Sequence, residues 1–500
     1  MQLKTRLEKK DKKCGILMPV SSLPSKYGIG SFGKWAYRFV DFLKEAGQTY
    51  WQMLPLVMTG YGDSPYQTVC DVSGNPYFID LETLRDEGLL TYREVEKAID
   101  KGDKIDYERL YRERFPLLRK AFSRFDVKDR KFKDFLKEKK FDDFAVFMAL
   151  SQKFGSEWIN WPNEFKFYNK EAIERSKTDN QDEYLFWQFV QYKFWSQYSS
   201  LKKYANNKGI SILGDLPLYV SYNSVDVWSD PKQFLLDENF KPKKVAGVPP
   251  DYFSEDGQLW GNPVYDYDQM RADGFSYWKK RLSNARSVYD LVRIDHFRGL
   301  DRFWAVPADS DTAKVGEWMA APGREIFSIV GTERIIAEDL GVLDEGVYGL
   351  IKDLSLPGMK VLSFAFEGDD KNDYLPWNVT EISFCYTGTH DIDTLIGYLK
   401  SLNGETLKKV KKMVERSLDY LGLYKSTSGL NAMCDAIIEI AFACKSKLAI
   451  LPLQDHLHLG SEYRINTPGS VGWWKVRIKE SVLTENLAKK IRLLAVRHGR

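Results

Sequence analysis

Short apolar segments that end in polar residues, glycine or proline recur along this chain of 500 residues. Most are separated by stretches long enough for a helix, a pattern typical of buried parallel strands joined by helical crossovers. The segments are residues 15–20, 50–56, 210–217, 291–297, 334–341, 359–366, 384–391 and 448–455. Eight parallel strands close a (β/α)8 barrel, so the sequence predicts an α/β TIM-barrel fold.

Two gaps between these segments, 57–209 and 221–290, are too long for one crossover. Within the first, seven aromatic residues between Tyr107 and Phe135 recur at spacings typical of one face of amphipathic helices, and residues 184–204 are also helical in period. We therefore expect large, mainly helical insertions after strands 2 and 3. The expected parts are 1–56 with strands 1 and 2, the helical subdomain 57–209, strand 3 at 210–222, the insertion 223–290, and strands 4–8 with C-terminal helices at 291–500.

Composition excludes several classes of protein. Hydrophobic residues make up 43% and charged residues 29%, as in ordinary globular proteins. The net charge of +3 is too small to give the positive electrostatic field by which proteins attract nucleic acid. No apolar run approaches the roughly 20 residues that a membrane span needs, and no signal-peptide core follows the N-terminus. We expect a cytoplasmic protein with neither a nucleic-acid nor a membrane partner. The five cysteines contain no CxxC pair, which argues against a disulfide framework or a zinc cluster.

Two short motifs have a functional and a plain structural interpretation. Residues 28–33 fit the dinucleotide fingerprint GxGxxG, but no strand leads directly into them, so a tight loop is the better interpretation. His456 and His458 form an HxH pair that could ligate a metal. Only five histidines exist to complete such a site, so we expect no metal.

Carboxylates at the ends of apolar runs are the stronger signal. Asp215, Asp295, Glu338 and Asp391 each follow buried-type residues, where an unpaired charge costs several kcal/mol. Any one of them alone is more often part of a structural ion pair. Four at the same end of four barrel strands would converge on one pocket, and retaining glycoside cleavage needs two carboxylates across a sugar ring. The 14% of aromatic residues agrees, because sugar rings stack on aromatic faces.

Three of these strand ends carry a family resemblance. Val292-Arg-Ile-Asp-His-Phe-Arg-Gly299, Ala337-Glu-Asp-Leu-Gly341 and Thr387-Gly-Thr-His-Asp391 resemble the signatures of the amylomaltases, the 4-alpha-glucanotransferases of glycoside hydrolase family 77 in the alpha-amylase superfamily. Matching motifs run from about residue 15 to residue 477 in family order. One departure is Val471-Gly-Trp-Trp-Lys-Val-Arg477, where the family usually has Asn-Trp, and it leaves the contacts of this loop open.

The resemblance implies a retaining transglycosylase that moves alpha-1,4-glucan segments from a donor to an acceptor without a metal or organic cofactor. Maltodextrins or starch and glycogen fragments would be donors, and glucose or maltodextrin would be acceptors. Asp295 would be the nucleophile, Glu338 the general acid/base and Asp391 the third carboxylate, which grips the sugar. The implied substrate-binding residues are Tyr61, Ser64, Tyr66, Asp215, Asp251, Tyr252, Phe253, Trp260, Arg293, Phe366, His390 and Asn466.

Two details of this assignment concern charge and access. Arg293 lies two residues before Asp295, on the same strand face, and would keep that carboxylate ionised. The segment 247–263 resembles a loop over the cleft, whose aromatic residues would hold an acceptor against water.

Other functions stay open from the sequence. An alpha-glucan hydrolase would use the same covalent intermediate, a glucan-binding protein without catalysis would be expected to lack a carboxylate, and a nicotinamide enzyme would rest on GxGxxG alone.

Overall fold

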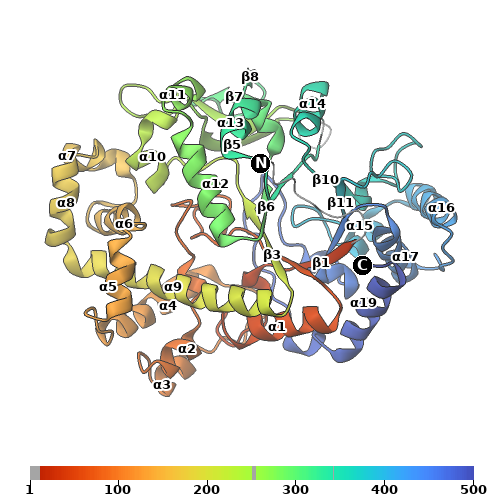
Figure 1. Ribbon diagram of the computed structural model, residues 1–500, viewed down its shortest axis with the longest axis horizontal. Helices are drawn as coiled ribbons and strands as arrows, with labels where there is room; N and C mark the ends of the chain where they lie inside the picture. The colour runs from red at the N-terminus through yellow and green to blue at the C-terminus, as the bar shows by residue number, and fades with distance from the viewer. Residues whose placement is uncertain (1–11, 251–254, 342) are drawn as a thin grey trace, which may run out of the picture.

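A barrel of eight parallel strands forms the centre of the protein. The computed structural model describes residues 12–250, 255–341 and 343–500 (Figure 1). The strands are β1 (Lys13–Leu17), β2 (Tyr50–Gln52), β3 (Ser211–Leu216), β6 (Leu291–Ile294), β9 (Ile335–Ala337), β10 (Gly358–Val361), β11 (Ser383–Tyr386) and β12 (Leu448–Pro452). Each overlaps one of the eight apolar segments, because their aliphatic side chains are buried on both faces of the sheet.

The strand order is β10-β11-β12-β1-β2-β3-β6-β9, with every neighbouring pair parallel. One further hydrogen bond joins the two ends of the sheet, since the amide of Ala337 donates to the carbonyl oxygen of Pro357 at 3.0 Å. The sheet is therefore a nearly closed barrel, and the predicted TIM-barrel fold is confirmed.

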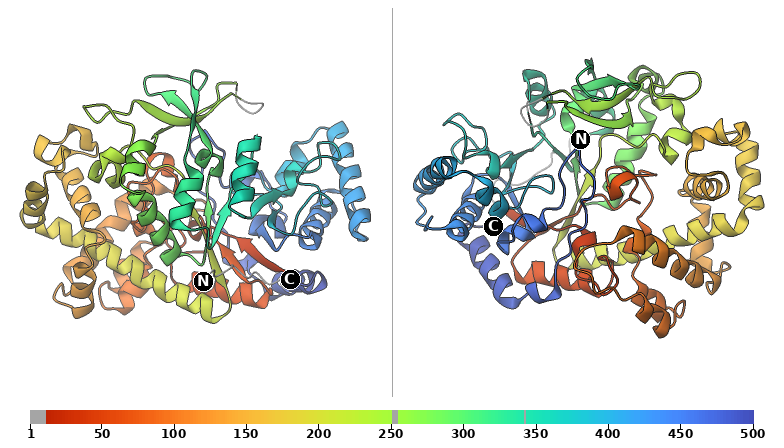
Figure 2. Two further views of the ribbon diagram at one scale, coloured as in Figure 1. Left: turned by 45° about the horizontal axis from the view of Figure 1, so that its top comes forward. Right: turned by 180° about the vertical axis from the view of Figure 1, so that it is seen from behind.

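Helices cover the outside of the barrel (Figures 1 and 2). They are α1 (Lys34–Glu45), α12 (Ser276–Val288), α13 (Gly323–Val330), α14 (Glu345–Asp353), α15 (Leu395–Ser401), α16 (Gly404–Leu421), α17 (Leu430–Ala443), α18 (Leu453–His456) and α19 (Glu485–Arg497). Among the described residues, none of the helices combines the length and apolar character required to cross a bilayer.

The segment between β2 and β3 is mainly helical and extends to one side of the barrel (Figure 1). Its helices are α2 (Leu81–Asp86), α3 (Tyr92–Lys97), α4 (Tyr107–Ser123), α5 (Arg130–Lys137), α6 (Asp142–Phe154), α7 (Asn163–Lys166), α8 (Lys170–Asp179) and α9 (Gln181–Asn207). Phe125 contacts Phe189 of α9 with ring centroids 4.9 Å apart, and Phe132 is fully buried. The amphipathic helices predicted from the aromatic spacing are thus confirmed, although Tyr111 is 66% exposed.

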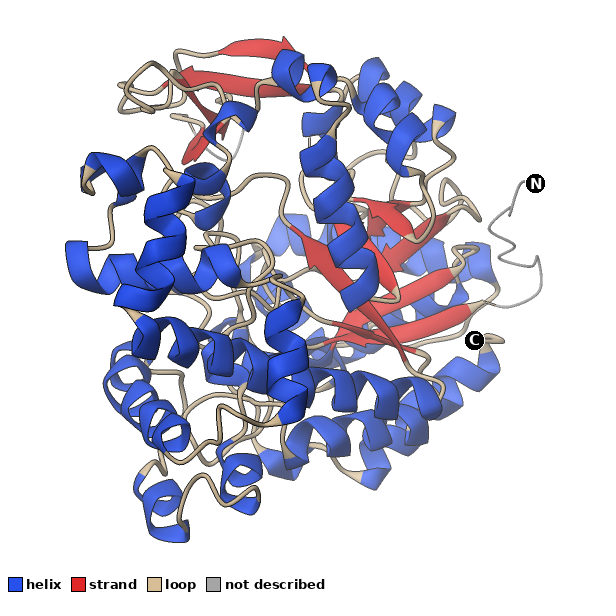
Figure 3. Cartoon of the chain, turned by 60° about the vertical axis from the view of Figure 1, so that its left-hand side comes forward, coloured by secondary structure: helices blue, strands red, loops and turns tan. Residues whose placement is uncertain are grey.

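A second, antiparallel sheet was not predicted from the sequence. Its order is β5 (Gln258–Pro263), β4 (Lys244–Val248), β7 (Arg302–Pro307) and β8 (Glu317–Ala320), and Figure 3 shows these strands apart from the barrel strands. Two short helices, α10 (Val225–Ser229) and α11 (Tyr267–Ala272), flank its first two strands in sequence. The segment 247–263, expected as a loop, therefore begins and ends in paired strands.

Candidate active site

The carboxylates singled out in the sequence all lie at the carboxyl ends of barrel strands. Asp215 is the penultimate residue of β3, Asp295 follows β6, Glu338 follows β9, and Asp391 lies just beyond β11. In the parallel pairing of β3 with β6, Asp215 lies directly beside Arg293. Because parallel strands all end at the same rim of a barrel, residues distant in sequence meet there.

Arg293 joins two of these carboxylates. Its Nη1 donates to both oxygens of Asp215 at 2.8 and 2.6 Å, and its Nη2 lies 3.0 Å from Oδ1 of Asp295. The Arg293 side chain is 3% exposed and that of Asp215 is fully buried, whereas that of Asp295 is 27% exposed. Arg293 and Asp215 thus form a buried support, and Asp295 is the member of the group that solvent or a ligand reaches.

Tyr66 connects this group to His390. Its hydroxyl donates to Oδ2 of Asp215 at 2.7 Å and lies 2.8 Å from Nε2 of His390. A phenol has one proton to donate, so Nε2 of His390 must carry the hydrogen at this contact. The same nitrogen is 3.1 Å from Oδ2 of Asp391.

Asn466 completes the network at its far end. Its amide nitrogen Nδ2 donates to Oδ1 of Asp391 at 2.7 Å, and its backbone N–H donates to the carbonyl of His390 at 3.0 Å. Hydrogen bonds and ion pairs therefore run without a break from Asp295 to Asn466, and every link is a residue predicted to belong to the site.

Glu338 enters the site from the next strand, held by backbone amides. The N–H of His296 donates to its Oε2 at 2.7 Å, and that of Leu340 donates to Oε1 at 3.2 Å. His296 itself has a left-handed backbone, with φ 48° and ψ 48°. A non-glycine residue in that region carries a cost of about 1 kcal/mol or more, so this turn is held by its surroundings.

Burial and charge give the three carboxylates different acidities. Burial raises the pKa of Glu338 well above its usual range, against the opposing effect of Arg293, and repulsion from Asp295 and Asp339 adds to the rise. Burial also raises the pKa of Asp295, with Arg293 as the main group that lowers it again. Burial would raise the pKa of Asp391 too, but His390 and Asn466 hold it at about 2.

Trp260, from β5, lies over the same region. Its ring packs edge-on against that of His296, with centroids 4.7 Å apart. Gln67 holds this strand to the loop that carries Tyr66, because its amide donates to the Trp260 carbonyl at 3.3 Å and to Oδ1 of Asn262 at 3.1 Å. The antiparallel sheet is thereby tied to the barrel rim next to Asp295.

The remaining predicted site residues are placed less directly. Ser64 accepts a hydrogen bond from the Tyr66 amide at 3.2 Å and so shapes that loop. Phe366 is 1% exposed within the second hydrophobic core, and its role as a glucan contact stays a prediction. Asp251, Tyr252 and Phe253, as well as the side chain of Tyr61, lie outside the described residues.

Trp474 belongs to the site although no role was predicted for it. Its ring centroid is 5.7 Å from that of Tyr66 and 6.0 Å from that of His390, and its backbone is left-handed with φ 69°. Its carbonyl accepts a hydrogen bond from Tyr107 at 3.1 Å, which joins this loop to the helical insertion. The only signal in the sequence was the departure from the family pattern at Val471–Arg477.

The two motifs with alternative interpretations lie elsewhere. Gly28–Gly33 precedes α1 but follows a short 3-10 helix at Val20–Ser22 rather than a strand. A Cβ on Gly30 would come within 1.9 Å of the Val20 carbonyl, so the glycine serves close packing of this turn. His458 contacts Oδ1 of Asp435 at 3.0 Å, while His456 is buried in α18.

Chemically, the rim offers an accessible carboxylate paired with an arginine, a second carboxyl group that binds protons strongly, and a third that stays ionised. This is the combination that nucleophilic displacement at a sugar carbon with proton transfer to the leaving oxygen requires. Among the described residues, no group of three or more His, Cys, Asp or Glu side chains is arranged to hold a metal ion.

Known proteins match this chain over nearly its full length. A family model described as 4-alpha-glucanotransferase matches residues 18–484. The 4-alpha-glucanotransferase of Clostridium butyricum is 42% identical over 495 residues, covering 97% of this chain and 100% of that protein. That of Aquifex aeolicus is 42% identical over 478 residues, covering 93% and 95%. The solved structure of amylomaltase from Streptococcus agalactiae in complex with acarbose has a TM-score of 0.92 at 36% identity, covering 98% and 99%.

Proposed function

We propose how this chain works from the premise that it belongs to the 4-alpha-glucanotransferase family, glycoside hydrolase family 77. It is a 4-alpha-glucanotransferase, an enzyme that transfers glycosyl groups. Its substrates are alpha-glucans, and we take maltodextrins or fragments of starch and glycogen as donors, with glucose or maltodextrin as acceptors.

In the first step, Asp295 attacks the anomeric carbon of a donor glucan. The glycosidic bond breaks, a glycosyl ester forms on the Asp295 carboxylate, and Glu338 gives its proton to the departing oxygen. The ion pair with Arg293 supports this role because it keeps Asp295 ionised despite burial. The raised pKa of Glu338 supports its role as the general acid, since an acid must hold its proton near neutral pH.

In the second step, the hydroxyl of an acceptor glucan attacks the ester. Glu338, now a carboxylate, takes the hydroxyl proton, a new glycosidic bond forms, and Asp295 is released as a carboxylate. Two inversions at the same carbon retain the configuration of the sugar.

Asp391 binds the sugar hydroxyls at the reacting ring. A carboxylate that accepts from hydroxyls must remain ionised, and its contacts with His390 and Asn466 ensure this. The single observation that carries the proposal is the unbroken network from Asp295 through Arg293, Asp215, Tyr66, His390 and Asp391 to Asn466. It holds Asp295, Asp215 and Asp391 in fixed relation before substrate arrives, while backbone amides hold Glu338.

Hydrolysis is the competing reaction, and one observation favours it. The Asp295 side chain is 27% exposed, so water has a route to the ester. Transfer requires that an acceptor displace this water, and Trp260, packed on His296 next to Asp295, provides an apolar surface for it.

Incubation with maltotriose separates the two reactions. Transfer would produce glucose together with longer maltodextrins while the concentration of reducing ends stays constant. A rise in reducing ends that matches the bonds broken would instead show that this chain is a hydrolase.

A further inference from the structure

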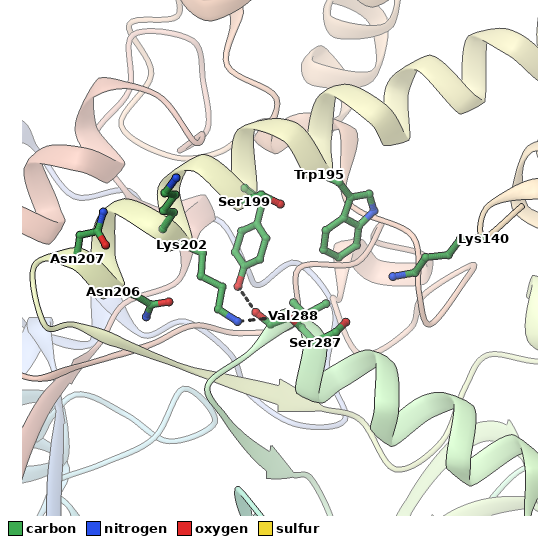
Figure 4. A pocket seen from close by; sticks show the side chains of 10 residues that line it. Lys140, Trp195, Ser199, Lys202, Asn206, Asn207, Ser287 and Val288 are labelled. Carbon is green, nitrogen blue, oxygen red and sulfur yellow. Dashed lines mark hydrogen bonds between the residues drawn. The ribbon is translucent and has the colours of Figure 1, made fainter. Parts of the chain in front are cut away.

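A cavity lies at the opposite end of the barrel from the carboxylates. It has a volume of about 410 Å³ and lies between the C-terminal half of α9, the end of α12 and Lys140 (Figure 4). Helix α9 leads into the start of β3, and α12 leads into the start of β6. The cavity is therefore near the amino ends of the strands, whereas the catalytic residues follow their carboxyl ends. Its size falls within the range of about 300–1,000 Å³ that small-molecule sites occupy.

The lining of this cavity is basic. It contains Lys140, Lys202 and Lys203 but no aspartate or glutamate. Lys202 is partly neutralised, because its ammonium lies 3.4 Å from Oδ1 of Asp290, whose other oxygen accepts from Asn206 at 2.8 Å. Within the described part of the chain, Lys140 and Lys203 form no ion pair. Two of the three positive charges are thus available to a ligand.

Trp195 adds a buried donor without an acceptor. Its indole N–H is shielded from solvent and has no hydrogen-bond partner among the described residues. An unpaired buried donor costs about 1–3 kcal/mol, and a ligand acceptor reaches this N–H once the side chains that cover it move aside. Lys140 lies 5.1 Å from the centre of the Trp195 ring, and Figure 4 shows the two side chains facing each other. Burial lowers the pKa of Lys140, and Glu138 opposes this shift.

We propose that this cavity binds a small phosphate monoester. A phosphate group has up to two negative charges and three strong acceptor oxygens, which suit a cavity whose lining includes two unpaired lysines and the indole N–H. The amide side chain of Asn207 and the hydroxyl of Ser199, also in the lining, are able to hydrogen-bond the alcohol part of the ester.

An adjoining basic cavity of about 440 Å³ is less suited to an anion. It shares Ser287 with the first and is lined by Lys279, Arg286 and Arg334. The Arg286 guanidinium already donates to the carbonyls of Val330 at 2.6 Å, Gly331 at 2.7 Å and Glu333 at 3.1 Å. Arg334 donates to the Arg286 carbonyl at 3.0 Å. The guanidinium groups of Arg286 and Arg334 are thus already hydrogen-bonded to backbone carbonyls.

Titration calorimetry of the full chain at low salt tests the proposal with inorganic phosphate and a hexose monophosphate as probes. We expect binding that weakens as salt is added, and a loss of about tenfold in affinity for Lys203→Gln and for Lys140→Gln. Trp195→Phe keeps the ring and removes only the N–H, and it should also weaken binding. Lys412→Gln, on an exposed part of α16, is the matched control and should bind as the parent does.

Tighter binding of the hexose monophosphate than of inorganic phosphate would identify an ester as the ligand. Equal affinities of the two probes, with the same lysine dependence, would support an anion site but overturn the assignment to an ester. No binding of either probe up to about 10 mM, or binding that the three cavity variants leave unchanged, would refute the site altogether.

Discussion

Replacing Arg293 by glutamine tests the electrostatic support of the proposed nucleophile. The variant removes the positive charge that lies 3.0 Å from Asp295 and 2.6 Å from Asp215, while glutamine keeps part of the side-chain volume and some hydrogen-bonding ability. Asp215 then remains fully buried without its cation. Asp295 loses the main group that lowers its pKa, so its pKa rises.

Two magnitudes follow from this geometry. Breaking a buried ion pair by removing one partner costs about 3–5 kcal/mol in the free energy of unfolding. A carboxylate next to an arginine has its pKa lowered by about 1–3 units, so the loss of Arg293 should raise that of Asp295 by a similar amount. Because Asp295 must be ionised to attack, the acid limb of the kcat/KM profile should move to higher pH by about 1–3 units.

The assay is the pH dependence of kcat/KM for maltotriose disproportionation, with unfolding in urea measured in parallel. Arg281→Gln is the matched control, since Arg281 is 2% exposed and its Nε donates to Oδ2 of Asp71 at 2.9 Å, outside the network. The control should lose comparable stability yet keep the acid limb in place. An acid limb that stays unshifted in Arg293→Gln, or shifts equally in both variants, would refute the reasoning.

Three further predictions concern single groups of the site. The raised pKa of Glu338 should set the basic limb of the kcat/KM profile, with activity falling as the pH rises through that pKa, and Glu338→Gln should abolish this limb; a limb that persists would contradict the acid assignment. Asn466→Ala removes the 2.7 Å hydrogen bond to Asp391 and should lower kcat/KM about tenfold or more, whereas an unchanged value would show that this bond does not position the carboxylate. Trp260→Ala should lose transfer more than hydrolysis, seen as more glucose released per longer maltodextrin formed, and an equal loss of both would show that Trp260 binds the donor only.

The barrel and the carboxylates could be predicted from the sequence because both leave local signals. A buried parallel strand such as β6 is apolar apart from Arg293, and the charge of Asp295 directly after it stands out. Strands β4 and β5 leave a weaker signal, since they contain Gly247 and Gly261, the two ends of β4 are only partly buried, and the first four residues of β5 are partly or fully exposed. The pairing of β4 with β7, about fifty residues later in the chain, has no local signature.

Contacts within the site depend on closure of the barrel, which no short segment encodes. Tyr66 meets His390 across 324 positions of the chain, and Trp474 reaches both from a loop whose sequence departs from the family pattern. A motif carries residue types but not the packing around them. Phe366 is 1% exposed in the second hydrophobic core, and its assignment by resemblance to a glucan contact stays a prediction.

The central claim is that Asp295 forms the covalent bond to the sugar. Its most direct measurement is mass spectrometry of Glu338→Gln after reaction with a glucosyl fluoride, a donor whose leaving group needs little help from an acid. The account predicts a glycosyl ester on the peptide that contains Asp295, and none when Asp295→Asn is added to the same variant. An ester on Asp391 or Asp215, or no ester while the donor is still consumed, would contradict it.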